Sequence, residues 1–277
     1  MKFEVHIPVT KSDEYIVDLI SGATELSKQA IKQVMSKGAV WLTRDGKTDR
    51  SRRAKKLAQE GDEVHLYFDQ KVLDEEPKDA ILIADEKSYS LWHKPYGMRS
   101  QGSKWGDHCA IGRWIETHLE PERAVFPIHR LDRAASGLMV FAHSKKIASA
   151  LASQFEKRTV DKKYMAVIDG KLGRELELSA DIDNRKALSR VCPLEHSASS
   201  QQTLVAVKIE TGRKHQIRKH LAGAGFPIIG DRLYNPNCKD SDPDLKLVSS
   251  FLEFDCPLTG ERKAFELPEE LRLRLHN

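Results

Sequence analysis

The sequence has few cysteines and no long apolar segment. Its four cysteines, Cys109, Cys192, Cys238 and Cys256, are widely scattered and form no Cys-x-x-Cys pair. This distribution argues against a disulfide framework or a structural zinc site and favours a reducing compartment. No apolar run approaches the ~20 residues that a membrane-spanning helix needs, and the first residues lack an apolar stretch of signal-peptide length. We therefore expect a cytosolic protein that does not enter a membrane.

A strong charge imbalance and the common cofactor motifs are also missing. Lys and Arg total 45 against 41 for Asp and Glu, a net charge of +4, so only the distribution of charge can indicate a nucleic-acid partner. Gly97, Gly102 and Gly106 are not part of a Gly-Lys-Ser or Gly-Lys-Thr loop of nucleotide hydrolases. His215 and His220 are five positions apart, a poor spacing for one metal ion on a helix face. The Gly-x-Ser-x-Gly turn of serine hydrolases is absent. We expect no metal site and no cofactor.

The first 70 residues have the pattern of a small αβ module. Apolar residues alternate with polar ones in its first strand and recur on one face of its helices. We expect strands at 3–7, 39–42 and 63–68, a short helix at 15–20 that ends near Gly22, and a second helix capped by Ser27 and stopped by Gly38. This arrangement resembles the alpha-L type RNA-binding domain first known from a small-subunit ribosomal protein, over roughly residues 3–69.

A basic stretch lies between the last two of these strands. Seven of the thirteen residues 44–56 are Lys or Arg. Such a run is often a solvated, mobile loop, but a basic cluster beside an exposed helix is also how small modules hold phosphate backbones. The resemblance favours the second interpretation. The residues that we expect to bind RNA here are Arg50, Arg52, Arg53, Lys55 and Lys56.

Residues 71–84 are charged and contain Pro77, as is typical of a linker. We therefore expect an RNA-binding module at 1–70, a linker at 71–84 and a larger domain at 85–277. In the larger domain, short strands alternate irregularly with helical segments such as 147–155. This order favours an α+β fold over a strict βαβ repeat. We expect a mixed, largely antiparallel sheet flanked by helices.

The larger domain contains an acidic residue between two arginines. Asp132 lies between Arg130 and Arg133, shortly before Ser136-Gly137 and an apolar run. A carboxylate flanked by guanidinium groups stays ionised, and at the entrance of a strand it suits a nucleophile or a general base. The alternative from this segment alone is a solvated turn with a surface ion pair.

Three further segments accompany this motif in a recognisable order. The four segments are 93–97, 129–137, 163–170 and 211–221. In order and spacing they resemble the RluA-type pseudouridine synthases, whose signatures are His-Arg-Leu-Asp-x-x-Thr-Ser-Gly and Gly-Arg-x-His-Gln-Ile-Arg-x-His. The resemblance covers about residues 88–270, and an alpha-L module ahead of the catalytic domain is common in this family.

The resemblance implies a role for each matching residue. Asp132 corresponds to the catalytic aspartate, Tyr164 to the tyrosine that packs against the target base, and Arg218 to the basic residue that pairs with the aspartate. Arg130 corresponds to the arginine that fills the place of the extruded base. Arg213 and His215 belong to the same motif as Arg218, and we expect them to support the site or to face RNA phosphates.

Two positions depart from the family pattern. Ala135 stands where threonine is usual, which we expect to weaken a local turn more than the chemistry. His93 stands where asparagine is more usual, which leaves the contacts of that entry loop open.

The implied reaction is the isomerisation of uridine, which breaks the bond from sugar to ring nitrogen and rejoins the base through a ring carbon. It needs no metal and no redox step. The carboxylate could attack the base, attack the sugar or abstract a proton, and the sequence does not choose. The base must leave its stack at a cost of a few kcal/mol, which Tyr164 and Arg130 are suited to offset.

We therefore expect an RNA pseudouridine synthase that acts, as a monomer, on structured ribosomal RNA or transfer RNA. One alternative is a non-catalytic RNA-binding or ribosome-assembly factor with the same fold. Another is a related base-modifying enzyme, for which the sequence shows neither a cofactor site nor metal ligands.

Overall fold

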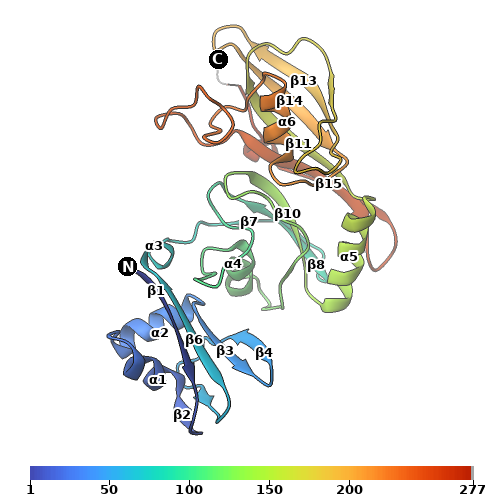
Figure 1. Cartoon of the computed structure of the whole chain (residues 1–277). Coiled ribbons are helices and arrows are strands. Elements are labelled where there is room, and N and C mark those ends of the chain that lie inside the picture. The colour runs from blue at the N-terminus through green and yellow to red at the C-terminus, as the bar shows by residue number, and fades with distance from the viewer. Residues whose placement is uncertain (276–277) are drawn as a thin grey trace. The chain divides into compact units, whose positions relative to one another are not determined.

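The computed structural model describes residues 1–275 and divides into two compact units (Figure 1). The smaller unit contains Met1–Lys78 and Gln101–Trp114, and the larger unit contains Asp79–Ser100 and the chain from Ile115 onward. The division passes through helix α4 (Ile111–His118). No helix among the described residues is both long and apolar enough to span a membrane.

The smaller unit is built on a four-stranded antiparallel sheet with the strand order β1-β6-β3-β4. Its elements are β1 (Lys2–Pro8), β2 (Glu14–Tyr15), α1 (Ile16–Ala23), α2 (Lys28–Ser36), β3 (Val40–Arg44), β4 (Lys47–Arg50), β5 (Leu57–Ala58), β6 (Glu63–Asp69) and α3 (Gln70–Leu73). Helices α1 and α2 lie beside each other (Figure 1). The strands and helices expected in residues 3–68 are therefore present.

The hydrophobic core of this unit explains why these elements form. The alternation in β6 turns Val64 and Leu66 toward the helices, where they pack with Ile16, Ile31 and Met35. The second helix begins where the sequence predicts, because the Ser27 hydroxyl accepts a hydrogen bond from the Ala30 N–H (3.2 Å).

The basic stretch 44–56 is more ordered than a mobile loop. Asp45 and Gly46 both have positive φ (50° and 73°) and form the tight turn of a hairpin between β3 and β4. Asp-Gly is a favoured pair for such a two-residue turn. The sequence analysis did not predict this turn, because it interpreted residues 44–56 by their charge and not by the Asp-Gly pair.

The larger unit contains a ten-stranded sheet. Its elements are β7 (Ile81–Asp85), β8 (Tyr89–Lys94), β9 (Phe126–Pro127), β10 (Ser136–Ala142), α5 (Lys145–Lys157), β11 (Asp161–Asp169), β12 (Leu176–Leu178), β13 (Ser189–Ser197), β14 (Gln202–Ile209), α6 (Gln216–Gly223), β15 (Leu247–Asp255), β16 (Arg262–Glu266) and the 3-10 helix η1 (Glu269–Leu271). The order is β12-β13-β14-β11-β15-β10-β8-β7, with β16 beside β15 and β9 beside β10.

Among the described strands of this sheet, β10 and β15 form the parallel pair and every other pairing is antiparallel. Figure 1 shows α6 against the part of the sheet that contains β13, β14 and β11, and α5 near β10. The prediction of an α+β fold with a mixed, largely antiparallel sheet is confirmed.

Residues 71–84 differ from the expected linker. Helix α3 extends into their beginning, and β7 occupies their end and pairs with β8 at the edge of the large sheet. The apolar run Ile81–Ala84 forms most of this strand. The sequence analysis assigned it to the linker because charged residues precede it. We therefore revise the boundary of the larger unit to Asp79 and add Gln101–Trp114 to the smaller unit.

Candidate active site

Asp132 lies in the loop between β9 and β10, which neighbouring segments hold in place. The Ser100 hydroxyl donates to the Leu131 carbonyl (2.6 Å) and accepts a hydrogen bond from the Leu131 N–H (3.0 Å). The fully buried Lys94 side chain at the end of β8 donates to the carbonyls of Met98 (2.9 Å) and Arg133 (3.4 Å). These contacts fix the chain next to Asp132, and a rigid support of this kind is what a positioned carboxylate requires.

The loop closes at Gly137, where a side chain has no room. Gly137 has φ +111° and pairs with Ser249 in the parallel contact between β10 and β15. A Cβ at this position would overlap the backbone of Ser249. The Ser-Gly pair that follows the Asp132 motif therefore reflects the close approach of two strands.

The Asp132 carboxylate faces a guanidinium group and an imidazole from the start of α6. Arg218 Nη1 lies 3.4 Å from Asp132 Oδ2, and His215 Nε2 lies 3.6 Å from Asp132 Oδ1. The Asp132 side chain is 24% exposed, whereas that of Arg218 is 5% exposed. A carboxylate that solvent can reach thus lies beside a buried cation.

Arg218 has a second acidic partner, Asp231, to which the sequence analysis assigned no role. Arg218 donates from Nε to Asp231 Oδ2 (2.8 Å) and from Nη2 to Oδ1 (2.6 Å). Burial opposes ionisation of Asp231, but these hydrogen bonds and the Leu233 N–H (3.0 Å) hold its pKa below the usual range. A bidentate pair fixes both the position and the plane of the guanidinium.

The first turn of α6 is shaped by His215 and Gln216. His215 has left-handed backbone angles (φ 55°), and its Nδ1 lies within hydrogen-bond distance of the Tyr234 hydroxyl (2.8 Å). Burial lowers the pKa of His215, although Asp132 opposes that effect. The buried Gln216 amide accepts from the Thr211 hydroxyl (2.6 Å) and holds the preceding loop against the helix. The Gly-Arg-x-His-Gln-Ile-Arg motif therefore builds one wall of the site.

Tyr164 on β11 lies on the same cavity as Asp132. The cavity has a volume of about 90 Å³, and its lining includes Asp132, Ala135, Tyr164, His215 and Arg218. Tyr164 is 8% exposed. Burial, together with the charge of Asp132, raises the pKa of Tyr164 to about 12, so its hydroxyl stays protonated at neutral pH. The ring is thus a neutral, apolar wall beside the carboxylate.

Arg130 and Arg213 line the same cavity and are more exposed to solvent than Arg218. Arg130 is exposed and lines this cavity beside Asp132. Arg213 also lines it and donates from Nε to the Lys186 carbonyl (3.1 Å). Both side chains therefore present positive charge to whatever enters the cavity.

The two departures from the family pattern have different surroundings. Ala135 is 3% exposed and lines the cavity, and its N–H donates to the Asp132 carbonyl (3.1 Å), which closes the turn without a side-chain hydroxyl. His93 lies on β8, and burial together with Lys94 lowers the pKa of its imidazole.

The basic residues expected to bind RNA in the smaller unit fall into two groups. Arg50 Nε lies 3.1 Å from Asp107, and Arg52 also pairs with that carboxylate. Arg50 further stacks over the Trp41 ring (4.1 Å to its centroid). These two arginines tie the segment Gln101–Trp114 to the hairpin. The residues that remain more accessible are Arg53 and Lys55, which are exposed, and Lys56, which is partly exposed.

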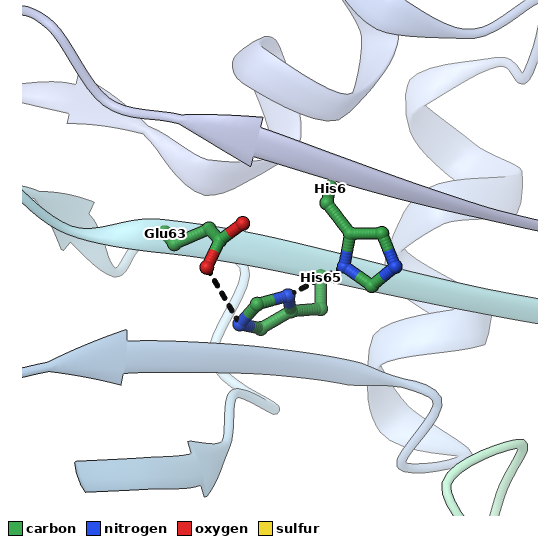
Figure 2. A group of neighbouring side chains, drawn as sticks. All are labelled: His6, Glu63 and His65. Atoms are coloured by element: carbon green, nitrogen blue, oxygen red, sulfur yellow. Dashed lines mark hydrogen bonds and ion pairs between the residues drawn. The ribbon is translucent and has the colours of Figure 1, made fainter. Parts of the chain in front are cut away.

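A second group of polar side chains lies on the outer face of the smaller sheet (Figure 2). His6 on β1 faces His65 on β6, with 2.7 Å between their Nδ1 atoms, and Glu63 lies 3.8 Å from His65 Nε2. Figure 2 shows that Glu63 and His6 approach different nitrogens of the His65 ring. His65 Nε2 also lies 2.7 Å from the Thr43 hydroxyl. Both ring nitrogens of His65 thus already have protein partners, an arrangement typical of a polar network that orders the sheet face.

Known proteins resemble this chain in sequence and in fold. The family model for RNA pseudouridylate synthase matches residues 88–223. The chain is 30% identical over 229 residues to an uncharacterized RNA pseudouridine synthase, YlyB, of Bacillus subtilis, covering 73% of this chain and 74% of that protein.

Two relatives with assigned names are also similar. The chain is 30% identical to tRNA pseudouridine synthase C of Haemophilus ducreyi, covering 56% of this chain and 73% of the relative. It is 30% identical to ribosomal large subunit pseudouridine synthase D of Neisseria meningitidis, covering 70% of this chain and 59% of the relative.

The fold also matches that of a solved structure. Human RNA pseudouridylate synthase domain containing 1 superposes with a TM-score of 0.60 at 20% identity, covering 70% of this chain and 86% of the human chain. From the sequence and fold together, the chain belongs to the RNA pseudouridine synthases of the RluA type.

Proposed function

We propose that the chain converts uridine to pseudouridine in structured RNA with Asp132 as its catalytic carboxylate. The observation that carries this proposal is the placement of Asp132 in one cavity with Tyr164, Arg218 and His215. The cavity combines an accessible carboxylate, a buried cation and an aromatic wall. These are the groups that a base taken out of its stack requires.

Each side chain has a distinct task in this proposal. Asp132 attacks the base or the sugar of the reacting nucleotide or removes a proton from it, while the bond from sugar to ring nitrogen breaks and the base rejoins the sugar through a ring carbon. Arg218 stabilises the negative charge nearby. Tyr164 supports the face of the base, and its hydroxyl is protonated at neutral pH because burial and Asp132 raise its pKa to about 12. Arg130 is exposed at the cavity and has the length to fill the gap that the base leaves in the RNA stack.

The proposed substrate class is taken from the names of the relatives. Proteins similar to this chain are named for transfer RNA and for the large ribosomal subunit, and we assign the present chain to RNA of these two kinds. We further propose that residues 1–70 help to bind RNA, with Arg53, Lys55 and Lys56 contacting phosphates. The protein acts in the cytoplasm as a monomer in this proposal.

The direct experiment is chemical mapping of pseudouridine in total RNA from cells with and without this protein. We expect one or a few uridines in ribosomal or transfer RNA to lose the modification when the gene is deleted. Complementation with the wild-type chain should restore them, and the Asp132→Asn chain should not. An unchanged map, or full restoration by Asp132→Asn, would point to the non-catalytic RNA-binding role instead.

A further inference from the structure

A second cavity adjoins the candidate active site and has a basic lining. Its volume is about 410 Å³, and it shares Arg130, Tyr164 and Arg213 with the smaller cavity around Asp132. It extends toward α5 and the start of β11, where Arg158 and Lys162 add two further cations to its wall. An RNA strand that places its reacting base beside Asp132 would therefore have a positively charged cavity next to that base.

Lys162 is the most unusual member of this lining. It is two residues before Tyr164 on β11, so both side chains point to the same face of the sheet, ~7 Å apart along the strand. The residue is only 7% exposed, and its Nζ lies 5.7 Å from the centroid of the Phe155 ring. Within residues 1–275, no carboxylate or carbonyl is within ion-pair or hydrogen-bond distance of this Nζ.

The acids near this cavity compensate the Lys162 charge only in part. Asp161, the adjacent residue, pairs with Lys208 (2.8 Å). Glu210 lines the cavity but pairs with Arg190, and Glu156 lines it from the exposed surface of α5. Burial and the neighbouring Arg158 lower the pKa of Lys162, while Asp161 opposes that effect only in part. An ammonium on a largely buried side chain without an anion is unfavourable, and a bound anion reduces that cost.

We propose that this cavity binds a backbone phosphate of the RNA strand next to the target uridine, with Lys162 as its principal contact. The inference rests on the proposed function for the identity of the anion. A compact ammonium suits a phosphate as a point charge, and Arg158, Arg130 and Arg213 around the same space suit the neighbouring phosphate oxygens. Lys162 is thus a binding residue that positions the strand, and the base remains with Tyr164.

The test compares Lys162→Gln with Lys162→Arg and with a matched control, Lys163→Gln. Lys163 is the next residue on β11, is exposed on the opposite face and has its Nζ 4.5 Å from the Phe251 ring centroid. The measurement is the affinity for oligouridylate across a range of salt concentrations. We expect Lys162→Gln to bind about tenfold more weakly at low salt and to reduce the slope of log K against log salt by about 0.7, one phosphate contact to a single strand. Lys162→Arg should keep most of the affinity, and Lys163→Gln should match the wild type.

Thermal unfolding of each variant separates binding from folding. If Lys162 only supports the packing around Phe155, Lys162→Gln changes the melting temperature and leaves the salt slope unchanged, which would overturn the inference. If the slope falls but the wild type forms pseudouridine in no RNA, the phosphate site stands and the proposed function is wrong. If the wild type is active and its slope and KM equal those of Lys162→Gln, the inference alone is wrong.

Discussion

Arg218 binds Asp231 more closely than it binds Asp132. Its Nε and Nη2 atoms lie 2.8 and 2.6 Å from the Asp231 carboxylate, whereas its Nη1 lies 3.4 Å from Asp132. Asp231 is fully buried and Asp132 is not. Asp231 therefore holds the guanidinium through Nε and Nη2, and Nη1 faces Asp132, the carboxylate that we assign to catalysis.

We predict that Asp231→Asn weakens both folding and catalysis. The substitution leaves the Arg218 charge buried without its bidentate partner, which typically costs about 3 kcal/mol of unfolding free energy. Because the guanidinium then turns toward other acceptors, we also expect the single-turnover rate to fall at least tenfold. Urea unfolding and a single-turnover assay measure the two effects. The control is Asp183→Asn, which removes an exposed pair with Lys219 (2.8 Å) and should change neither quantity. Equal stability of the two variants would contradict this assignment of Asp231.

Gly137→Ala should displace the loop that carries Asp132. A methyl group there would overlap the Ser249 backbone, and the positive φ of Gly137 already disfavours any other residue. We expect a loss of about 3 kcal/mol of unfolding free energy or more, together with loss of activity. Gly223→Ala, in α6 and with open space at its Cβ, is the matched control. It should be neutral or slightly stabilising. A Gly137→Ala variant as stable as that control would refute the close strand contact.

The stability of the larger unit should fall as pH decreases from 7 to 5, in part through His129. Its ring stacks on Phe155 (4.7 Å between centroids), and its Nε2 accepts a hydrogen bond from the Val140 N–H (3.2 Å). Burial lowers the pKa of His129 to about 3. The unfolded chain takes up a proton near pH 6.5 and the native chain does not, so protons favour unfolding below that pH.

We expect His129 to account for about 1–2 kcal/mol of this loss at pH 5. The measurement is unfolding free energy against pH for the wild type and for His129→Gln, whose curve should be flatter by that amount between pH 7 and pH 5. Parallel curves for the wild type and His129→Gln would contradict this prediction, because they would show that His129 takes up no proton on unfolding between pH 7 and pH 5.

In the smaller unit, the exposed basic residues and the paired ones should behave differently. Replacing Arg53 and Lys55 together with Gln removes two accessible charges. We expect this variant to bind RNA more weakly with a smaller salt slope and to keep its melting temperature. Arg52→Gln removes a contact with Asp107 instead, so we expect it to lower the melting temperature of the smaller unit with little effect on the slope. The opposite pattern would place the RNA contacts on the paired arginines.

Local sequence signals predicted the elements that depend on neighbouring residues. The Ser27 cap, the alternation at β1 and the helical segment 147–155 each depend on residues a few positions apart, so the sequence alone predicted these elements. The Asp-Gly turn before β4 is also a local signal, but the sequence analysis missed it because it interpreted this stretch from its basic residues.

Contacts between distant positions were not visible in the sequence. Asp107 meets Arg50 and Arg52 only after the chain has returned to the smaller unit. Asp231 follows α6 by several residues and becomes important only because the fold turns it back onto Arg218. The family resemblance supplied the pairing of Asp132 with Arg218, which spacing alone does not indicate.

The most direct test of the central claim is the single-turnover rate of pseudouridine formation by Asp132→Asn on an RNA that the wild type modifies. The side chain keeps its size and loses its charge, so RNA binding and the melting temperature should stay near wild type. We predict that product formation falls below detection. Pseudouridine formation at the wild-type rate by this variant would contradict the assignment of Asp132 as the catalytic carboxylate.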